Sequence, residues 1–499
     1  MGSQAEPRLH LPCERDEKLA AKLKAFVYQA DALEAIKNLE YSAVFHEPGL
    51  GKTKIGVDLI LYWLSKDVVD SAIVVTKRGL IENWRAEVSA HSFLQPRVLD
   101  QNRRANFYAF NSPTRVYLTH YEVFRKEEKR LALFLKTRRV GIILDEAHKI
   151  KNPDSAITTV FLGLRSGFKR RVIMTGTPVA NRPYDVWAPI YFLDSGASLG
   201  TDFNQFRRDL DLSNDLAFDP HRVEAFQDNL AGVFGRVSSF AVRATKVSAG
   251  IVLPQKEIRN VPAVLEDRQR EIYERFKKEN AAIVVKEGVP HLDKADELLK
   301  RLMRLVEVAS NPSLVDESYK RQPGKFAILQ GIVDRVVDAG EKVIVWTSFT
   351  ENVRWLSREL ECFGTAMVSG KLSYEERSSS LKRFKEHADT RILIATPGSA
   401  KEGLTLTVAN HAVFYDRSFS LDDYLQAQDR IHRISQTRKC YVYNLIAQDS
   451  IDEWVDVLLT AKRLAAMLAQ GDITREQYEA EATYEFGRII REVLGLEEQ

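Results

Sequence analysis

The chain has 499 residues, of which 44% are hydrophobic and 28% are charged. This length and composition predict about two to four globular domains with buried cores. The 72 basic and 69 acidic residues leave a net charge of only +3, so any surface for a polyanion must come from local clustering. No apolar run approaches the roughly 20 residues that span a bilayer, and the N-terminus lacks a secretory pattern. We therefore expect a soluble protein without a membrane anchor. Its three widely spaced cysteines predict reduced thiols.

Short, apolar and β-branched runs alternate with helical patterns in the first part of the chain. The runs are SAVF (42–45), AIVVT (72–76), RVYLT (115–119), VGIILDE (140–146) and RVIMTGT (171–177). Strands of this kind, separated by helices, predict a parallel sheet that is covered on both faces. We assign this α/β domain to residues 1–195.

The pattern then becomes helical and charged over residues 196–325, which we interpret as an insert between two domains. Strand-like runs resume afterwards. They are KVIVWTSF (342–349), TAMVSG (365–370), RILIAT (391–396), HAVFYD (411–416) and KCYVYNLI (439–446). A second parallel α/β domain is therefore predicted over 326–455, followed by a helical tail over 456–499.

The segment HEPGLGKT (46–53) has the strand, glycine-rich loop and helix order of a phosphate-binding loop. Gly49 and Gly51 allow backbone N–H groups to close around phosphate oxygens. Lys52 is predicted to contact the β- and γ-phosphates, and Thr53 to bind Mg²⁺. His46 replaces the first glycine of the consensus, so an ordinary strand-to-helix turn is the alternative.

The segment DEAH (145–148) ends the predicted strand GIIL. Carboxylates at the C-terminal end of a parallel strand face the crevice of an open α/β sheet. Asp145 is therefore a candidate Mg²⁺ ligand, and Glu146 is a candidate general base for an attacking water. The alternative interpretation is a polar helix start.

The segment QAQDRIHRISQ (426–436) places Arg430 and Arg433 three residues apart in a stretch predicted to be helical. Two guanidiniums at this spacing lie on one helix face and can reach a single anion. They are candidate arginine fingers for the phosphate site. The alternative is a solvated helix face on which they pair with Asp429 or Asp423.

These motifs, together with MTGTPVANRPYDVW (174–187), resemble the Snf2-like ATPases of helicase superfamily 2 over most of residues 26–455. The resemblance implies two RecA-like lobes that enclose ATP and Mg²⁺. It assigns adenine contact to Gln29 and adds Gly403 to the nucleotide site. The loop HEP (46–48) and the segment TPGSAKEGLTLT (396–407) depart from the common family pattern. The latter is nearer to the HARP-type annealing branch.

The resemblance also implies a duplex held through its phosphates, without sequence preference. Double-stranded DNA is the expected partner, with branched or single-stranded DNA as alternatives. Trp84 has an equal alternative as a core residue. The candidate DNA contacts are Lys77, Arg78, Asn83, Trp84, Thr119, Tyr121, Thr347, Ser348, Lys371 and Thr396.

The sequence thus predicts a DNA-stimulated ATPase that translocates along double-stranded DNA and remodels DNA or protein–DNA structures. One alternative is a strand-separating helicase motor of a repair, restriction or phage system. A DNA-binding scaffold without turnover is a third, which the retained Lys52, Glu146 and Arg433 oppose. We expect a monomer in the cytoplasm or nucleoid, or in the nucleus of a eukaryote, and the sequence indicates no particular protein partner.

Overall fold

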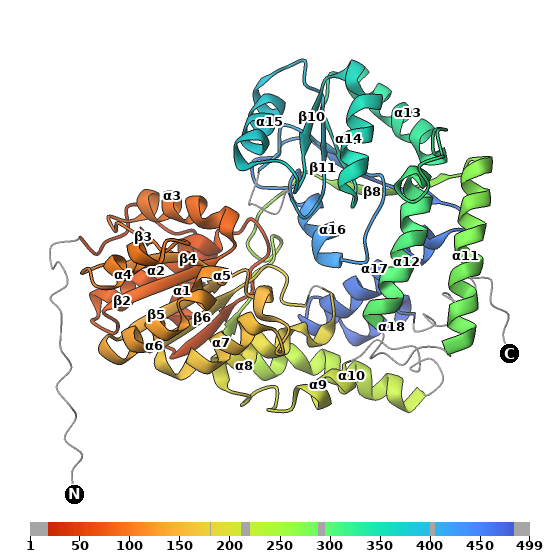
Figure 1. Cartoon of the computed structure of the whole chain (residues 1–499). Helices are drawn as coiled ribbons and strands as arrows, with labels where there is room; N and C mark the ends of the chain where they lie inside the picture. The colour runs from red at the N-terminus through yellow and green to blue at the C-terminus, as the bar shows by residue number, and fades with distance from the viewer. Residues whose placement is uncertain (1–17, 180, 211–219, 288–294, 400–404, 484–499) are drawn as a thin grey trace, which may run out of the picture. The chain divides into compact units, whose positions relative to one another are not determined.

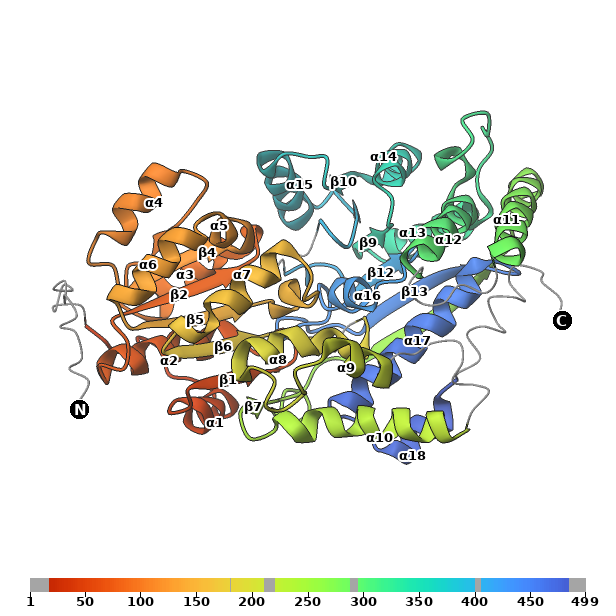
Figure 2. The same ribbon diagram turned by 60° about the horizontal axis from the view of Figure 1, so that its bottom comes forward.

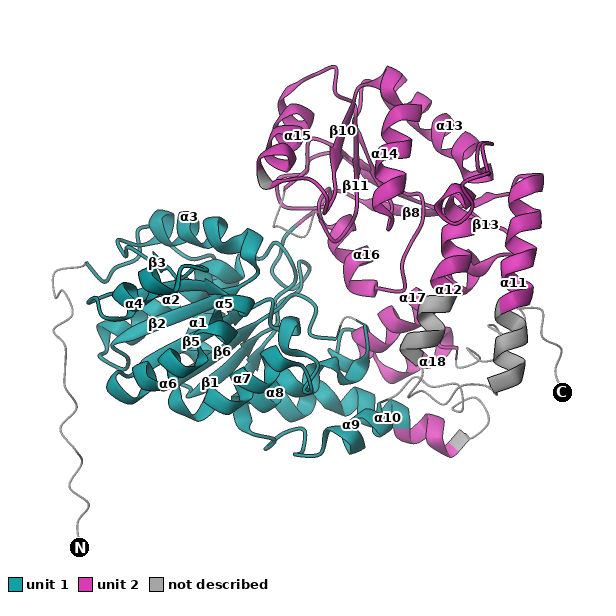
Figure 3. Ribbon diagram, in the orientation of Figure 1, with its two compact units in different colours: residues 1–211, 226–251, 469–472 teal, residues 212–225, 252–468, 473–499 magenta. Residues whose placement is uncertain are grey.

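The computed structural model describes residues 18–179, 181–210, 220–287, 295–399 and 405–483. Figure 1 shows the whole chain, and Figure 3 shows its two compact units. The first unit comprises residues 1–211, 226–251 and 469–472, and the second comprises 212–225, 252–468 and 473–499. Each contains one parallel sheet.

The first unit contains a seven-stranded sheet in the described part of the chain, ordered β3-β4-β2-β5-β6-β1-β7. All of its neighbouring strands are parallel. The strands are β1 (Tyr41–Val44), β2 (Ser71–Thr76), β3 (Arg97–Val98), β4 (Val116–His120), β5 (Val140–Asp145), β6 (Arg170–Met174) and β7 (Ala241–Val242). The register pairs Val75 with Leu144, so the ends of β2 and β5 lie side by side.

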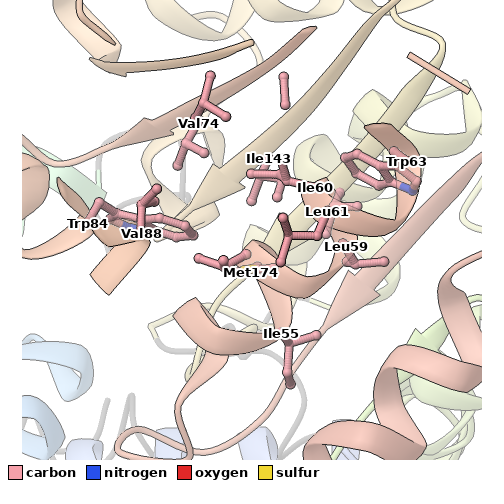
Figure 4. Packing of buried hydrophobic residues seen from close by; sticks show 14 of the residues in the cluster. Ile55, Leu59, Ile60, Leu61, Trp63, Val74, Trp84, Val88, Ile143 and Met174 are labelled. Atoms are coloured by element: carbon pink, nitrogen blue, oxygen red, sulfur yellow. The ribbon is translucent and has the colours of Figure 1, made fainter. Parts of the chain in front are cut away.

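Helices cover both faces of this sheet (Figure 2). On one face, side chains of α2, α3 and the strands form a core that includes Ile60, Val74 and Trp84 (Figure 4). The alternate strand residues Ile73 and Val75 are also buried, which requires cover on the opposite face. The helices of this part of the chain are α1 (Val27–Ile36), α2 (Lys52–Ser65), α3 (Ile81–His91), α4 (Arg103–Phe110), α5 (Tyr121–Lys126), α6 (Glu128–Thr137), α7 (Ala156–Leu164), α8 (Trp187–Asp194), α9 (Phe203–Asp209) and α10 (Pro220–Val237).

The second unit contains a six-stranded parallel sheet in the described residues, ordered β10-β11-β9-β12-β13-β8. Its strands are β8 (Lys256–Ala263), β9 (Val343–Trp346), β10 (Thr365–Val368), β11 (Ile392–Ala395), β12 (His411–Phe414) and β13 (Cys440–Ala447). Its helices are α11 (Asp267–Glu287), α12 (Ala295–Ser310), α13 (Gly324–Asp338), α14 (Thr350–Glu359), α15 (Tyr374–Glu386), α16 (Leu421–Gln428), α17 (Ile451–Ala469) and α18 (Arg475–Glu481). None of the helices described could cross a membrane on grounds of length and apolar character.

The predicted fold class, α/β with two parallel sheets, is confirmed. The expectation of a helical segment between them was incomplete, because residues 196–325 also contain β7 and β8. The strand β7 has two residues, which is too short for a recognisable pattern. The strand β8 lies at a sheet edge and is mostly exposed or half-buried, so its sequence KEIRNVPA is polar. The proposed domain limits at 195, 325 and 455 stay predictions.

Candidate active site

The phosphate-type loop connects the buried strand β1 to α2, which begins at Lys52. Gly49 and Gly51 have φ values of +89° and +67°, a backbone region that favours glycine. The Lys52 ammonium donates hydrogen bonds to the backbone oxygens of His46 at 2.8 Å and Glu47 at 3.3 Å. The lysine is therefore folded back over its own loop, where its charge is available to an anion bound at the helix start.

Gln29 of α1 packs against this loop. Its Nε2 donates to the Leu50 backbone oxygen at 3.2 Å, and its Oε1 accepts from the Phe26 N–H at 3.0 Å. A Cβ atom at Gly51 would lie 2.4 Å from Gln29 Nε2, so glycine is required there sterically as well as conformationally. The structure gives Gln29 a role in holding the loop, while its predicted contact with adenine stays a prediction.

Asp145 is fixed by donors from three neighbouring elements, β2, α3 and α5. Its Oδ2 accepts from Thr76 Oγ1 at 3.0 Å and from Trp84 Nε1 at 2.7 Å, while Tyr121 donates to its backbone oxygen at 2.7 Å. Burial and the nearby charge of Glu146 raise the pKa of Asp145, against the lowering effects of Trp84, Lys52 and Thr76. Thr76 and Trp84 were not predicted as partners, because their contact with Asp145 depends on the register of β2 and β5.

Glu146 follows β5 with a left-handed backbone (φ +55°), which is uncommon for a residue other than glycine. Its Oε2 lies 3.7 Å from Lys77 Nζ and 3.2 Å from His148 Nδ1. The Lys77 contact follows from the sheet, because the two residues occupy equivalent positions, each two residues beyond the Val75–Leu144 pair. A candidate DNA contact and the candidate base are thus neighbours.

Two other segments support the phosphate loop. A Cβ at Gly176 would lie 2.7 Å from Pro48 Cγ, so the TGTP segment touches the loop through a residue without a side chain. From the other side, Arg243 donates to the Phe45 backbone oxygen at 3.0 Å, and Glu47 accepts from the Lys246 N–H at 2.7 Å. Arg243 and Lys246 belong to FAVRATK (240–246), the segment that contains β7.

His46 is 2% exposed, at the position where the consensus has glycine. Its ring lies 6.3 Å from that of Tyr28, centroid to centroid. Burial, together with the charge of Lys52, lowers the pKa of His46 to about 4. The residue is therefore neutral at physiological pH, and it adds no second cation beside Lys52.

The arginine segment of the second unit is not helical, and this prediction was wrong. Helix α16 ends at Gln428. The Arg430 backbone oxygen accepts from the Leu406 N–H at 3.0 Å, and Gln436 Nε2 donates to the Ile431 oxygen at 3.0 Å. These bonds use carbonyl groups that a continuing helix would need. The two arginines therefore do not share a helix face.

The structure gives some of the local contacts of Arg430 and Arg433, and the alternative of pairing with Asp429 or Asp423 stays a prediction. Arg430 is 5% exposed. Arg433 donates to the Asp429 backbone oxygen at 2.9 Å and to Thr405 Oγ1 at 3.2 Å, and burial lowers the pKa of Arg433 despite the nearby Asp429 charge. Gly403 lies outside the described residues. Because Lys52 and the arginines belong to different units, their assembly into one site stays a prediction.

Two family models match the chain. The SNF2-related domain covers residues 28–314, and the helicase conserved C-terminal domain covers residues 324–435. The chain belongs to the SNF2-related family. It is a Snf2-like ATPase of helicase superfamily 2, as the motifs indicated.

Similar proteins include the Chromodomain-helicase-DNA-binding protein 1-like of Danio rerio, 26% identical over 85% of this chain and 42% of that protein. The DNA repair and recombination protein RAD54-like of Drosophila erecta is 26% identical over 82% of this chain and 57% of its own length. The chain thus spans only about half the length of these curated relatives. A solved structure, the Sulfolobus solfataricus SWI2/SNF2 ATPase core in complex with dsDNA, is 23% identical with a TM-score of 0.41, covering 96% of this chain and 98% of that one.

Several candidate DNA contacts of this SNF2-related chain have buried side chains, and their contact with DNA stays a prediction. Their hydroxyl groups bind the protein itself. Thr119 Oγ1 donates to the Leu99 backbone oxygen at 3.3 Å, and the Tyr121 hydroxyl donates to the Asp145 backbone oxygen at 2.7 Å. Thr347 Oγ1 donates to Asp416 Oδ2 at 2.6 Å, and Thr396 Oγ1 donates to Ser399 Oγ at 2.7 Å. Trp84 is also buried, as its alternative interpretation required.

The remaining candidate contacts are more accessible. Arg78 is exposed, whereas Lys77 is half-buried and its Nζ atom is covered by protein. Lys371 pairs with Glu351 at 2.5 Å, and the Ser348 N–H donates to Asp416 Oδ1 at 2.6 Å. Their contact with DNA stays a prediction.

The described residues contain no group of three or more His, Cys, Asp or Glu side chains suited to a metal ion. The predicted Mg²⁺ ligands do not require such a group, because Mg²⁺ in nucleotide sites is held by one or two protein groups, substrate phosphates and water. Thr53 at the start of α2 and the fixed carboxylate of Asp145 provide that donor set. The charge of Lys52 acts on Asp145, which indicates that loop and carboxylate form one electrostatic site.

Proposed function

We propose that this protein hydrolyses ATP with Mg²⁺ when it binds double-stranded DNA, and that it uses the hydrolysis to translocate along the duplex. The family membership supports ATP-driven action on DNA. The geometry of the first unit supports a working phosphate site rather than a scaffold that has lost turnover. Its loop, Lys52 and Asp145 are held by many bonds of their own unit.

Each site residue then has a role in the reaction. Lys52 and the loop N–H groups bind the β- and γ-phosphates, and Thr53 and Asp145 hold Mg²⁺, which neutralises phosphate charge. Glu146 orients the attacking water and accepts its proton. Arg430 and Arg433 stabilise the negative charge that develops on the transferred phosphoryl group.

The contact between Lys77 and Glu146 carries the proposal of DNA stimulation. In the structure, the Lys77 ammonium lies 3.7 Å from the Glu146 carboxylate, where its positive charge favours the charged carboxylate and weakens it as a proton acceptor. The Lys77 Nζ atom is covered by protein in the structure, so a DNA phosphate that binds it must draw the ammonium group away from Glu146. Binding of the duplex would thereby release Glu146 for catalysis.

The first test measures ATP hydrolysis without nucleic acid and with duplex DNA, single-stranded DNA or RNA. Duplex DNA should stimulate the wild type most, and Glu146→Gln should remain inactive under every condition. Displacement of a triplex strand without separation of the duplex supports translocation. Separation of the duplex strands would instead select the helicase function, and no stimulation by any nucleic acid would refute the proposal.

The second test is Lys77→Met, with the neighbouring exposed cation Arg78→Met as a matched control. If Lys77 restrains Glu146, its replacement raises the DNA-free rate severalfold and reduces the stimulation ratio at saturating duplex. Arg78→Met should weaken duplex binding and leave the DNA-free rate unchanged. An unchanged DNA-free rate in Lys77→Met would refute the coupling while leaving the ATPase proposal intact.

A further inference from the structure

A cavity of about 800 Å³ lies in the first unit between α4 and the α5–α6 segment. These helices belong to the connections around β3, β4 and β5 (Figure 2). In the sheet order, β3 and β4 are at the end opposite β1, which precedes the phosphate loop. The cavity is therefore separate from the candidate active site, and none of the predicted DNA contacts lines it.

The walls of the cavity are aromatic and aliphatic. Phe110 and Phe134 are buried and stack edge to face at 5.1 Å between ring centroids. Phe107 and Leu133 are 52% and 64% exposed. Large apolar residues that are exposed beside a cavity are typical of binding sites, because covering them removes apolar surface from water.

The rim of the cavity is mostly basic, although it also carries the exposed Glu128. Arg103, Arg125, Lys126 and Lys129 line it and are exposed, and within the described residues none of these four has an ion-pair partner. The Glu127 carboxylate does not pair with these four cations, because it accepts hydrogen bonds from Arg130 at 2.6 Å and from Asn106 at 3.1 Å.

We propose that this cavity is a docking site for an acidic amphipathic segment of a partner protein. Its apolar side chains would enter between Phe107 and Leu133, and its carboxylates would meet the rim cations. Buried apolar anchors supply most of the energy of such interfaces, while complementary charge supplies specificity and speeds association. Duplex DNA would satisfy the cations but has no comparable apolar group on its backbone for the cavity, so the protein segment fits the chemistry better.

The proposal can be tested with a displayed library of short random peptides selected on the full chain. Counter-selection on Leu133→Glu, which changes an exposed wall residue, removes peptides that bind elsewhere. We expect the surviving peptides to combine Asp or Glu with aromatic or aliphatic residues. Survival of no peptides, or of peptides without an acidic bias, would overturn the proposal.

A labelled peptide from that selection then provides a titration by fluorescence anisotropy. Lys129→Glu should weaken its binding by about tenfold or more, with stronger loss at low salt. Lys136→Glu is the matched control, because Lys136 is exposed on the same helix but does not line the cavity. Equal effects of the two changes would refute the site. Loss of duplex binding in Lys129→Glu without loss of peptide binding would assign the surface to DNA instead.

Discussion

Asp145 and Arg433 are charged candidate site residues in different units, and the structure holds them in different ways. The Asp145 carboxylate accepts side-chain hydrogen bonds from Thr76 and Trp84, residues that lie beside it because β2 and β5 are adjacent. Arg433 is held by a backbone oxygen and a hydroxyl group. A carboxylate fixed by such donors is preorganised for a cation. A guanidinium carries several donors in a planar fork, so it can bind a backbone oxygen and an anion at the same time. We therefore expect the Asp145 carboxylate to matter most for binding and the Arg433 guanidinium most for turnover.

The largest effect is expected from Arg433→Ala, which tests whether Arg433 acts in turnover. If Arg433 is an arginine finger, turnover should fall by about 10³- to 10⁵-fold, while ATP affinity should change little. The measurements are the steady-state rate with saturating duplex and the direct binding of a fluorescent ATP analogue. Arg438→Ala is the control, since Arg438 is a half-buried arginine two residues beyond this segment that also donates to a backbone oxygen. Equal losses of affinity and turnover in Arg433→Ala would contradict its assignment.

The next largest effect is a loss of folding stability at low pH, which we expect from His46 in the phosphate loop. Because the pKa of His46 falls from 6.5 to about 4 on folding, the unfolded chain binds the proton more tightly. The stability contributed by neutral His46 is therefore present above pH 6.5 and is lost as pH falls toward 4, by at most about 3 kcal/mol.

This effect is measured with His46→Gln, which should lose less stability than the wild type between pH 7 and pH 4.5. Urea denaturation at several pH values gives the comparison, and His387→Gln provides a control at an exposed histidine. If His46→Gln follows the wild-type pH dependence, His46 is not held neutral by burial.

A smaller effect is expected from Trp84→Phe, which removes one donor to Asp145. Since the Trp84 hydrogen bond lowers the pKa of Asp145, its loss should move the acid limb of the rate profile to higher pH. It should also raise the Mg²⁺ concentration required by about tenfold or more. Trp63→Phe is a matched control, because Trp63 is equally buried in the same core and its indole nitrogen has no hydrogen-bond partner among the residues that the structure describes. Similar pH dependence of the rate in both variants would show that the Trp84 hydrogen bond does not tune Asp145.

The smallest expected effect comes from Gly176→Ala. The added methyl group would lie 2.7 Å from Pro48 Cγ and should displace the phosphate loop slightly, raising KM for ATP severalfold with a modest change in kcat. Gly163→Ala in α7 has nothing within 4 Å of the new atom and should retain wild-type kinetics. An unchanged KM in Gly176→Ala would show that the loop tolerates the contact.

The sheets could be predicted because their central strands are short, apolar and β-branched. Such patterns do not reveal β8, whose edge position permits polar residues, or the end of α16, which depends on bonds to Leu406 and Gln436. The motif sequences identified Lys52, Asp145 and Glu146 as site candidates. The Trp84–Asp145 and Lys77–Glu146 contacts required the pairing of β2 with β5, which a linear pattern does not specify.

The Trp84 indole also gives the protein an internal optical reporter. Its N–H points to a carboxylate that we propose binds Mg²⁺, so a change in charge at that carboxylate alters the electric field across the ring. The emission wavelength of Trp84 should therefore shift when Mg²⁺ and ATP bind. A variant that keeps this tryptophan and replaces the others by phenylalanine would follow loading of the first unit in real time, without an attached dye.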